Sequence, residues 1–113
     1  MTGLAALLVA ATSLHITVWP NGRDHPPRRT FTLACAPAAG TLPHARAACS
    51  KLAALQRPFA PTPRQTACTQ IYGGPQQALI VGRFRGRAVR SSFNRRNGCE
   101  IYRWNRVAFL FPQ

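Results

Sequence analysis

The sequence predicts a single small domain that combines several short strands with one amphipathic helix. The chain has 113 residues, which suits one domain with a modest hydrophobic core. Residues 43–55 carry apolar side chains at the spacing of a helix. Other segments show the alternation or the short apolar runs typical of strands, namely residues 14–18, 30–35, 78–84, 87–93 and 107–111.

The first two strands are expected to pair with each other. Residues 14–18 alternate large apolar and polar side chains, and a Pro-Asn-Gly turn follows them. Residues 30–35 resume the alternation and place Phe31, Leu33 and Cys35 on one face. The connection between the two segments is polar and lacks periodicity, so we expect a loop across which the strands pair.

The helix is expected over residues 43–55. Thr41 suits the N-cap position, and Pro43 falls in the first turn, where its missing N–H costs nothing. The apolar face consists of Ala45, Ala48, Cys49, Leu52 and Leu55. Residues 57–64 contain three prolines and therefore cannot form a helix or a central strand.

The second half of the chain contains a predicted hairpin. Residues 78–84 and 87–93 are separated by an Arg-Gly pair, and a two-residue connection with glycine is a strong hairpin signal. Residues 94–98 are polar and predict a turn. Residues 107–111 are mostly apolar, so we expect a buried closing strand there.

Residues 1–13 are expected to lie outside the domain, which then comprises residues 14–113. Leu4 to Ala11 form an apolar run that is too short to span a membrane, and small residues follow it as in a secretory signal. We therefore interpret residues 1–13 as a residual signal peptide or a disordered arm. No other stretch of the sequence is a candidate membrane span.

The charge of the chain is strongly positive. Fifteen Lys and Arg residues stand against Asp24 and Glu100, for a formal net charge of +13. Such a charge attracts acidic partners, so one alternative function is a secreted cationic protein that binds acidic polymers, nucleic acid or membrane surfaces. The sequence has no zinc-finger spacing and no ribonucleoprotein motif, so no specific nucleic-acid partner is expected.

Catalytic and metal sites are not expected. The two carboxylates lie far apart in the sequence, which disfavours a paired acid–base hydrolase. His15, His25 and His44 are not at the spacing of metal ligands. The cysteines are even in number and can all pair, which leaves no free thiol for catalysis. We expect neither enzymatic activity nor a metal or other cofactor.

The four cysteines, Cys35, Cys49, Cys68 and Cys99, predict two disulfides. Three pairings are possible, and economy of the chain favours Cys35 with Cys49 and Cys68 with Cys99. Disulfides persist in oxidising surroundings, so we expect a secreted, extracellular protein.

Residues 67–75 (Ala-Cys-Thr-Gln-Ile-Tyr-Gly-Gly-Pro) form a stretch between a cysteine and a turn. Cys68 can anchor one end through a disulfide, while Gly73, Gly74 and Pro75 force a turn at the other end. A backbone held extended between two fixed points can be presented to a protease with its ordering entropy already lost. We interpret the stretch as a bait loop; the alternative is a surface loop stapled for stability.

Several blocks of the sequence together resemble the Streptomyces subtilisin inhibitor family, a group of secreted protein inhibitors of serine proteases. The matching blocks are Leu33 to Pro37, Gly40 and Thr41 with Pro43, Ala47 to Cys49 with Leu52, Cys68 to Tyr72, Asn97 to Glu100, and Val107 to Phe109. The most specific feature is the four-cysteine framework with a tyrosine four positions after the third cysteine.

The resemblance implies an α+β fold with a five-stranded antiparallel sheet, one main helix, a short second helix and the two sequential disulfides. It also implies a homodimer formed through the sheets. The run Gly73-Gly74-Pro75 departs from the Asp-Pro that is usual in the family, which predicts a softer far side of the loop.

By position, the resemblance makes Gln70–Ile71 the reactive bond and Gln70 the primary specificity residue. The flanking contacts that it implies are Thr69, Tyr72 and Gly73, and the loop supports are Cys68, Cys99 and Asn97. A long neutral side chain suits the pocket of a subtilisin-like protease better than a trypsin-like pocket, which favours a cation. The expected partner is a secreted subtilisin-like serine protease, inhibited by a tight-binding pseudo-substrate.

Overall fold

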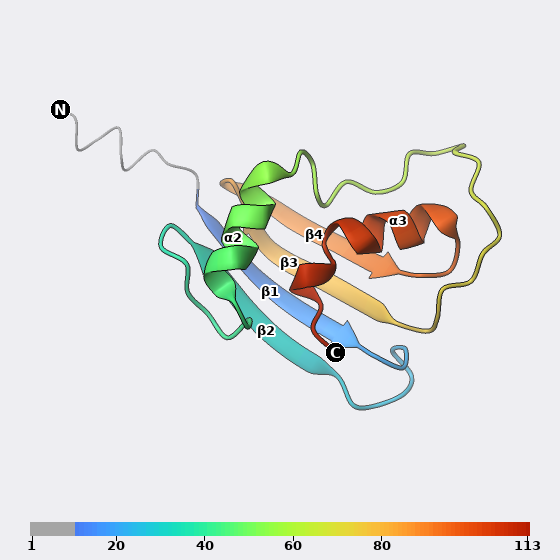
Figure 1. Ribbon diagram of the computed structural model, residues 1–113, viewed down its shortest axis with the longest axis horizontal. Coiled ribbons are helices and arrows are strands. Elements are labelled where there is room, and N and C mark those ends of the chain that lie inside the picture. Colours follow the sequence, from blue (N-terminus) through green and yellow to red (C-terminus); the bar gives the residue numbers. More distant parts are fainter. Residues whose placement is uncertain (1–10) are drawn as a thin grey trace.

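The computed structural model describes residues 11–113. A four-stranded antiparallel sheet carries both helices on one face (Figure 1). The elements are β1 (Thr12–Trp19), β2 (Arg29–Cys35), α2 (Ala45–Ala54), β3 (Gln77–Phe84), β4 (Arg87–Asn94), α3 (Gly98–Arg106) and the 3-10 turn η1 (Ala108–Leu110). The α+β class is confirmed. Of the predicted signal or arm, residues 1–10 lie outside the described residues, while Thr12 and Ser13 belong to β1 and therefore to the domain. No helix within residues 11–113 is long and apolar enough to cross a membrane.

The strand order of the sheet is β2-β1-β3-β4. The predicted pairing of the first two strands is confirmed, with Leu14 opposite Leu33. The predicted hairpin is also confirmed, because β3 and β4 pair antiparallel around Arg85 and Gly86. Both turn residues have positive φ, 52° and 81°, the combination that matches the twist of the flanking strands.

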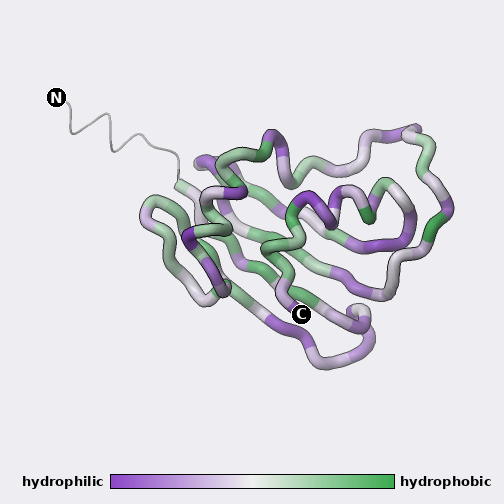
Figure 2. Tube along the Cα trace, in the orientation of Figure 1, coloured by the Kyte–Doolittle hydropathy of each residue, from purple (hydrophilic) through white to green (hydrophobic). Residues whose placement is uncertain are grey.

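The core lies between the sheet and the helices. Alternate strand residues point into it, including Ile16, Val18, Ile80 and Phe93, all of which are buried. Figure 2 shows the same division along the chain, since hydrophobic residues follow the strands and hydrophilic residues gather in the connection between β1 and β2. Burial of this apolar surface stabilises the fold by about 25 cal/mol per Å².

The predicted fifth strand over residues 107–111 is wrong. A hydrogen bond from the Leu110 N–H to the Val107 carbonyl (2.9 Å) closes the turn η1 there. Val107, Leu110 and Phe111 are nevertheless buried. A short apolar run is compatible with a strand or with a buried turn. Here the turn brings these side chains into the core, so the sheet has four strands.

Helix α3 was implied by the family resemblance but was not located from the residues. It begins at Gly98, where the sequence predicted only the end of a turn. The Asn97 Oδ1 accepts a hydrogen bond from the Glu100 N–H (3.1 Å) and so caps the helix. Asn followed three residues later by Glu is the signal that could have marked this helix start.

Helix α2 begins at Ala45, two residues later than predicted, and Thr41 is not its N-cap. The Thr41 Oγ1 accepts a hydrogen bond from the Thr32 N–H (2.9 Å), and the Thr41 N–H donates to the Thr32 Oγ1 (3.1 Å). Thr41 therefore forms hydrogen bonds with Thr32 on the outer edge of β2 and does not cap the helix. The predicted apolar face is confirmed, with Ala48 and Leu52 buried.

Both disulfides join the cysteines in the predicted order. The Cys35–Cys49 disulfide, which spans 14 residues, fastens α2 to the end of β2. The Cys68–Cys99 disulfide, which spans 31 residues, joins the long connection between α2 and β3 to the first turn of α3. In the chain-entropy model they contribute about 3 and about 4 kcal/mol to the free energy of unfolding.

Candidate functional site

The long connection between α2 and β3 contains the candidate site. It has no helix or strand, and it lies at the end of the molecule away from the turn between β3 and β4 (Figure 1). Gln70, Ile71 and Tyr72 are exposed, and Ile71 and Tyr72 retain 59% and 66% of their accessible surface. Two adjacent large side chains displayed in this way form a surface suited to binding a partner.

The amino-terminal side of this exposed span is anchored to the start of α3. Cys68 forms the disulfide with Cys99, and the Gly98 N–H donates a hydrogen bond to the Thr69 carbonyl (3.0 Å). The Thr69 side chain lies so close to Gly98 that a Cβ at residue 98 would collide with the Thr69 Oγ1. Glycine at this position therefore allows the loop to rest on the helix.

The carboxyl-terminal side is anchored at Gly73. The Gly73 N–H donates to the Arg95 carbonyl (2.7 Å), and the Arg95 Nε donates to the Gly73 carbonyl (3.1 Å). The Arg95 Nη1 also donates to the Asn105 Oδ1 (3.1 Å), and the guanidinium lies 5.8 Å from the centre of the Trp104 ring. A Cβ on Gly73 would lie 2.8 Å from the Ile101 Cδ1, so only glycine fits without a shift.

Both anchors belong to residues 95–99, which connect β4 to α3. The far side of the loop, predicted to be softer, is held there by the two hydrogen bonds between Arg95 and Gly73. Between the anchors, residues 70–72 make no hydrogen bond to the rest of the described chain. The site is therefore a short span of free backbone between two fixed points.

The structure places the predicted site residues together and adds others. The predicted loop support Asn97 caps α3 by accepting a hydrogen bond from the Glu100 N–H. It therefore supports the loop indirectly, by fixing the conformation of residues 95–99, which hold both anchors. Arg95, Gly98 and Ile101 were not singled out from the sequence, although all three contact the loop. No spacing in the sequence relates Arg95 to a residue 22 positions earlier.

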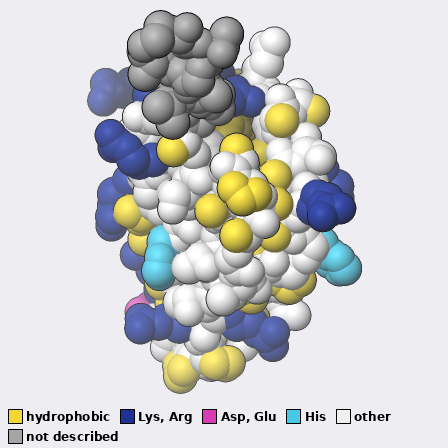
Figure 3. Space-filling view, turned by 90° about the vertical axis from the view of Figure 1, so that its left-hand side faces the viewer, with side chains coloured by type: hydrophobic (Ala, Val, Ile, Leu, Met, Phe, Trp, Pro, Cys, Tyr) yellow, Lys and Arg dark blue, Asp and Glu magenta, His cyan; other side chains and the backbone are white. Residues whose placement is uncertain are grey.

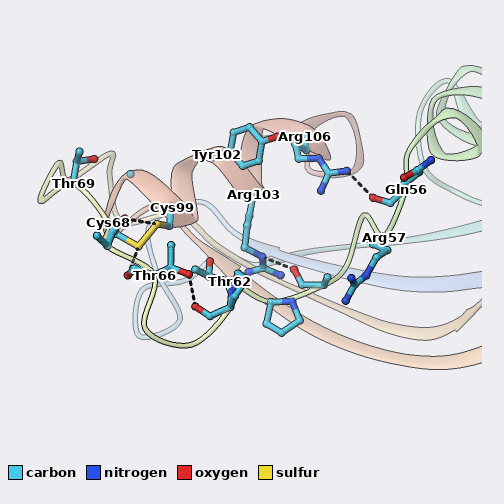
Figure 4. Close-up of a pocket in the computed structure, with 15 residues that line it drawn as sticks. Gln56, Arg57, Thr62, Thr66, Cys68, Thr69, Cys99, Tyr102, Arg103 and Arg106 are labelled. Carbon is cyan, nitrogen blue, oxygen red and sulfur yellow. Dashed lines mark hydrogen bonds between the residues drawn. A yellow bond between two sulfur atoms is a disulfide. The ribbon is translucent and has the colours of Figure 1, made fainter.

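A groove of about 660 Å³ adjoins the loop beside the Cys68–Cys99 disulfide (Figure 4). It lies between residues 56–69 and α3. Tyr102 of α3 lies beside the groove and is 66% exposed. The groove thus continues the exposed surface of the loop along one flank of the molecule.

Arg103 lines this groove and connects α3 to two other segments of the chain. Its guanidinium donates to the carbonyls of Ala60 (2.9 Å) and Ser92 (3.0 Å) and to the Glu100 Oε1 (3.0 Å). The Glu100 Oε2 accepts a hydrogen bond from the Thr62 Oγ1 (2.8 Å). One of the two carboxylates of the chain therefore ties the proline-rich segment, residues 57–64, to α3. Within residues 11–113, no three His, Cys, Asp or Glu side chains are grouped so that they could hold a metal.

Both a family model and solved structures match this chain. The family model for subtilisin inhibitor-like domains matches residues 10–97. Among solved structures, a chain in the complex of Streptomyces caespitosus sermetstatin with Bacillus licheniformis subtilisin is 29% identical, with a TM-score of 0.47. That match covers 86% of this chain and 96% of the other. No curated protein matches the sequence.

Proposed function

This chain belongs to the subtilisin inhibitor-like family, and we propose that it is a secreted inhibitor of subtilisin-like serine proteases that acts through residues 70–72. Its family is one of inhibitors, so the chain is a binding protein and not an enzyme. The observation that carries the proposal is the exposed span between the anchors at Cys68 and Gly73.

The reactive bond in this proposal is Gln70–Ile71. The protease serine attacks the Gln70 carbonyl, whose oxygen enters the oxyanion hole of the enzyme. If the bond breaks, the Gln70 half stays attached through Cys68, and the Ile71 half stays attached through Gly73. The new amine therefore remains beside the acyl-enzyme at a high effective concentration, and religation competes with hydrolysis.

The anchors also lower the cost of binding. Residues 70–72 lose little further freedom in the complex because the backbone is already held on both sides. Thr69 and Tyr72 flank the bond as further contacts with the protease. Gln70 is long and neutral, which favours a broad subtilisin-like specificity pocket over a pocket that binds a cation.

A homodimer through the open face of the sheet is part of the proposal. Leu79 and Val81 alternate with the buried residues of β3 and therefore lie on the face opposite the helices. Arg90 is the cross-strand partner of Val81, and its charge would oppose close contact of two such faces. Dimer affinity should therefore rise with salt, which light scattering at two salt concentrations would measure.

The test of the function is titration of a subtilisin with the oxidised protein. We expect one-to-one inhibition that is lost in Gln70→Pro, because proline fixes φ and removes the N–H at the first residue of the exposed span. Gln113→Pro makes the same change at the end of the chain and should inhibit normally. No inhibition of subtilisin, or of chymotrypsin-like and trypsin-like proteases, would refute the proposal. The cationic-binder alternative would then be tested through salt-dependent binding to acidic polymers.

A further inference from the structure

Most of the positive charge of the chain has no carboxylate beside it. Among residues 11–113 the only ion pair joins Arg103 to Glu100. Asp24, the other carboxylate, is exposed in the connection between β1 and β2. A protein that approaches the loop therefore meets positive charge that the chain itself does not neutralise.

Arginines stand on both sides of the exposed span. On the side of the disulfide, Arg57 and Arg106 line the groove (Figure 4), and Arg64 is exposed four residues before Cys68. On the other side, Arg96 lines a hollow of about 280 Å³ together with Tyr72. We call Arg57, Arg64, Arg96 and Arg106 the rim arginines.

The sign of the charge is the same on both sides. None of the residues that line the groove is an acid. The hollow also contains Arg23 and Asp24, whose charges offset each other, so Arg96 sets its sign. The span at residues 70–72 is thus flanked by positive charge in both directions along the loop.

Three of the four rim arginines differ from those that build the site, whereas Arg106 donates a hydrogen bond to the Gln56 carbonyl (2.8 Å). The guanidinium group of Arg95 holds the loop, and that of Arg103 holds the proline-rich segment, residues 57–64. Arg57, Arg64 and Arg96 are exposed, and within residues 11–113 their side chains form no hydrogen bond or ion pair. Their charge is therefore available to a partner.

We propose, on the basis of the proposed function, that the rim arginines select subtilisin-like proteases whose active-site cleft is flanked by Asp and Glu residues. A protease bound to residues 70–72 brings the edges of its cleft toward Arg64 on one side and Arg96 on the other. Exposed charges at the rim of an interface mainly speed association and change dissociation little. The preferred target is an acidic-rimmed protease, which the chain captures fastest at low salt.

The control must separate this rim from the overall charge. Arginine and lysine side chains also lie along the edges of the face at the end of the molecule opposite the loop (Figure 3). Arg46 is exposed on α2, and Arg83 is exposed at the far end of β3. Arg83 lies six residues after Gln77, about 20 Å along the strand from the end nearest the loop. Substitution of this distant pair removes the same charge without changing the rim.

The experiment measures association and dissociation rate constants by stopped flow. The enzymes are a subtilisin and a variant of it with carboxylates introduced around its cleft. The inhibitors are the wild type, Arg64→Gln/Arg96→Gln and Arg46→Gln/Arg83→Gln. At low salt the wild type should associate about fivefold faster with the acidic variant than with the parent enzyme. This preference should nearly vanish in Arg64→Gln/Arg96→Gln and persist in Arg46→Gln/Arg83→Gln. The dissociation rate constants of both variants should stay within about twofold of the wild-type value.

Two results would overturn the inference while leaving the proposed function intact. One is a preference for the acidic enzyme that both double variants lose equally, which would assign it to overall charge. The other is a preference that persists unchanged in Arg64→Gln/Arg96→Gln. If the wild type inhibits neither enzyme, the proposed function fails and the selection by the rim arginines fails with it.

Discussion

Arg95 and Gly73 hold each other by two hydrogen bonds that run in opposite directions. The Gly73 N–H donates to the Arg95 carbonyl at 2.7 Å, and the Arg95 Nε donates to the Gly73 carbonyl at 3.1 Å. The same guanidinium donates to Asn105 of α3. One residue thus connects the carboxyl-terminal end of the exposed span to both the backbone of the β4–α3 connection and the helix.

Substitution Arg95→Ala should turn a lasting inhibitor into a temporary one. It removes the side-chain bond to Gly73, a charge-assisted hydrogen bond worth about 1.5–3 kcal/mol, but keeps the backbone bond and the disulfide. The freed Ile71 half would then leave the enzyme more often. We expect cleaved inhibitor to accumulate over hours in mass spectra, with recovery of protease activity. Arg90→Ala, on the open face of the sheet, is the control. Inhibition that lasts equally long with Arg95→Ala and with Arg90→Ala would contradict the role of Arg95.

Substitution Gly73→Ala should weaken both folding and inhibition. The added Cβ would lie 2.8 Å from the Ile101 Cδ1, and overpacking of this kind costs about 1–3 kcal/mol. The second substitution Ile101→Ala makes room, so the double variant should inhibit better than Gly73→Ala alone. Thermal unfolding and inhibition constants of the two single variants and the double variant test the coupling. Additive effects would show that the contact with Ile101 is not what requires glycine.

Substitution Gln70→Lys should redirect the loop to trypsin-like proteases. The exposed side chain can change without loss of packing, and a cation fits the trypsin specificity pocket. We expect trypsin inhibition to appear while the midpoint of thermal unfolding stays constant. Gln65→Lys adds the same charge to an exposed position in the same connection and should not inhibit trypsin. Equal inhibition of trypsin by both variants would argue against Gln70 as the specificity residue.

Removing each disulfide in turn should distinguish its effect on stability from its effect on inhibition. Cys68→Ser/Cys99→Ser and Cys35→Ser/Cys49→Ser should lower the free energy of unfolding by about 4 and about 3 kcal/mol, according to loop length. Only the first pair holds the exposed span, so only its removal should convert the inhibitor into a substrate. Urea unfolding and cleavage by subtilisin, both at low temperature, give the two readouts. Rapid cleavage of both double variants would indicate that general stability, not the local anchor, protects the bond.

Substitution Arg103→Lys should destabilise the domain despite retaining the charge. The arginine side chain is only 10% exposed and reaches carbonyls on two separate segments, and a lysine ammonium cannot reproduce this planar set of donors. We expect a loss of about 2–4 kcal/mol by urea unfolding. Arg106→Lys removes one hydrogen bond to the Gln56 carbonyl and should cost less than about 1.5 kcal/mol. Comparable decreases in the free energy of unfolding in both variants would contradict a larger contribution of Arg103 to stability.

The sequence determined the features that depend on neighbouring residues. Alternation predicted four strands within two residues of their ends, helical spacing predicted the buried face of α2, and the Arg-Gly pair predicted the hairpin. The order of the four cysteines favoured the pairing that the structure shows. The same local pattern predicted a bait loop around Gln70, because a cysteine and a glycine-rich turn enclose the stretch, and this role stays a prediction.

Only the tertiary structure decided how distant segments meet. An apolar run such as residues 107–111 suits a strand or a buried turn, and the core, not local preference, selected the turn. Likewise, the pairing of Arg95 with Gly73 and the close contact of Gly73 with Ile101 depend on where α3 lies against the loop. Such contacts join residues more than 20 positions apart, and no periodicity in the chain encodes them. They exist because burial of the sheet and the helices places the two segments side by side.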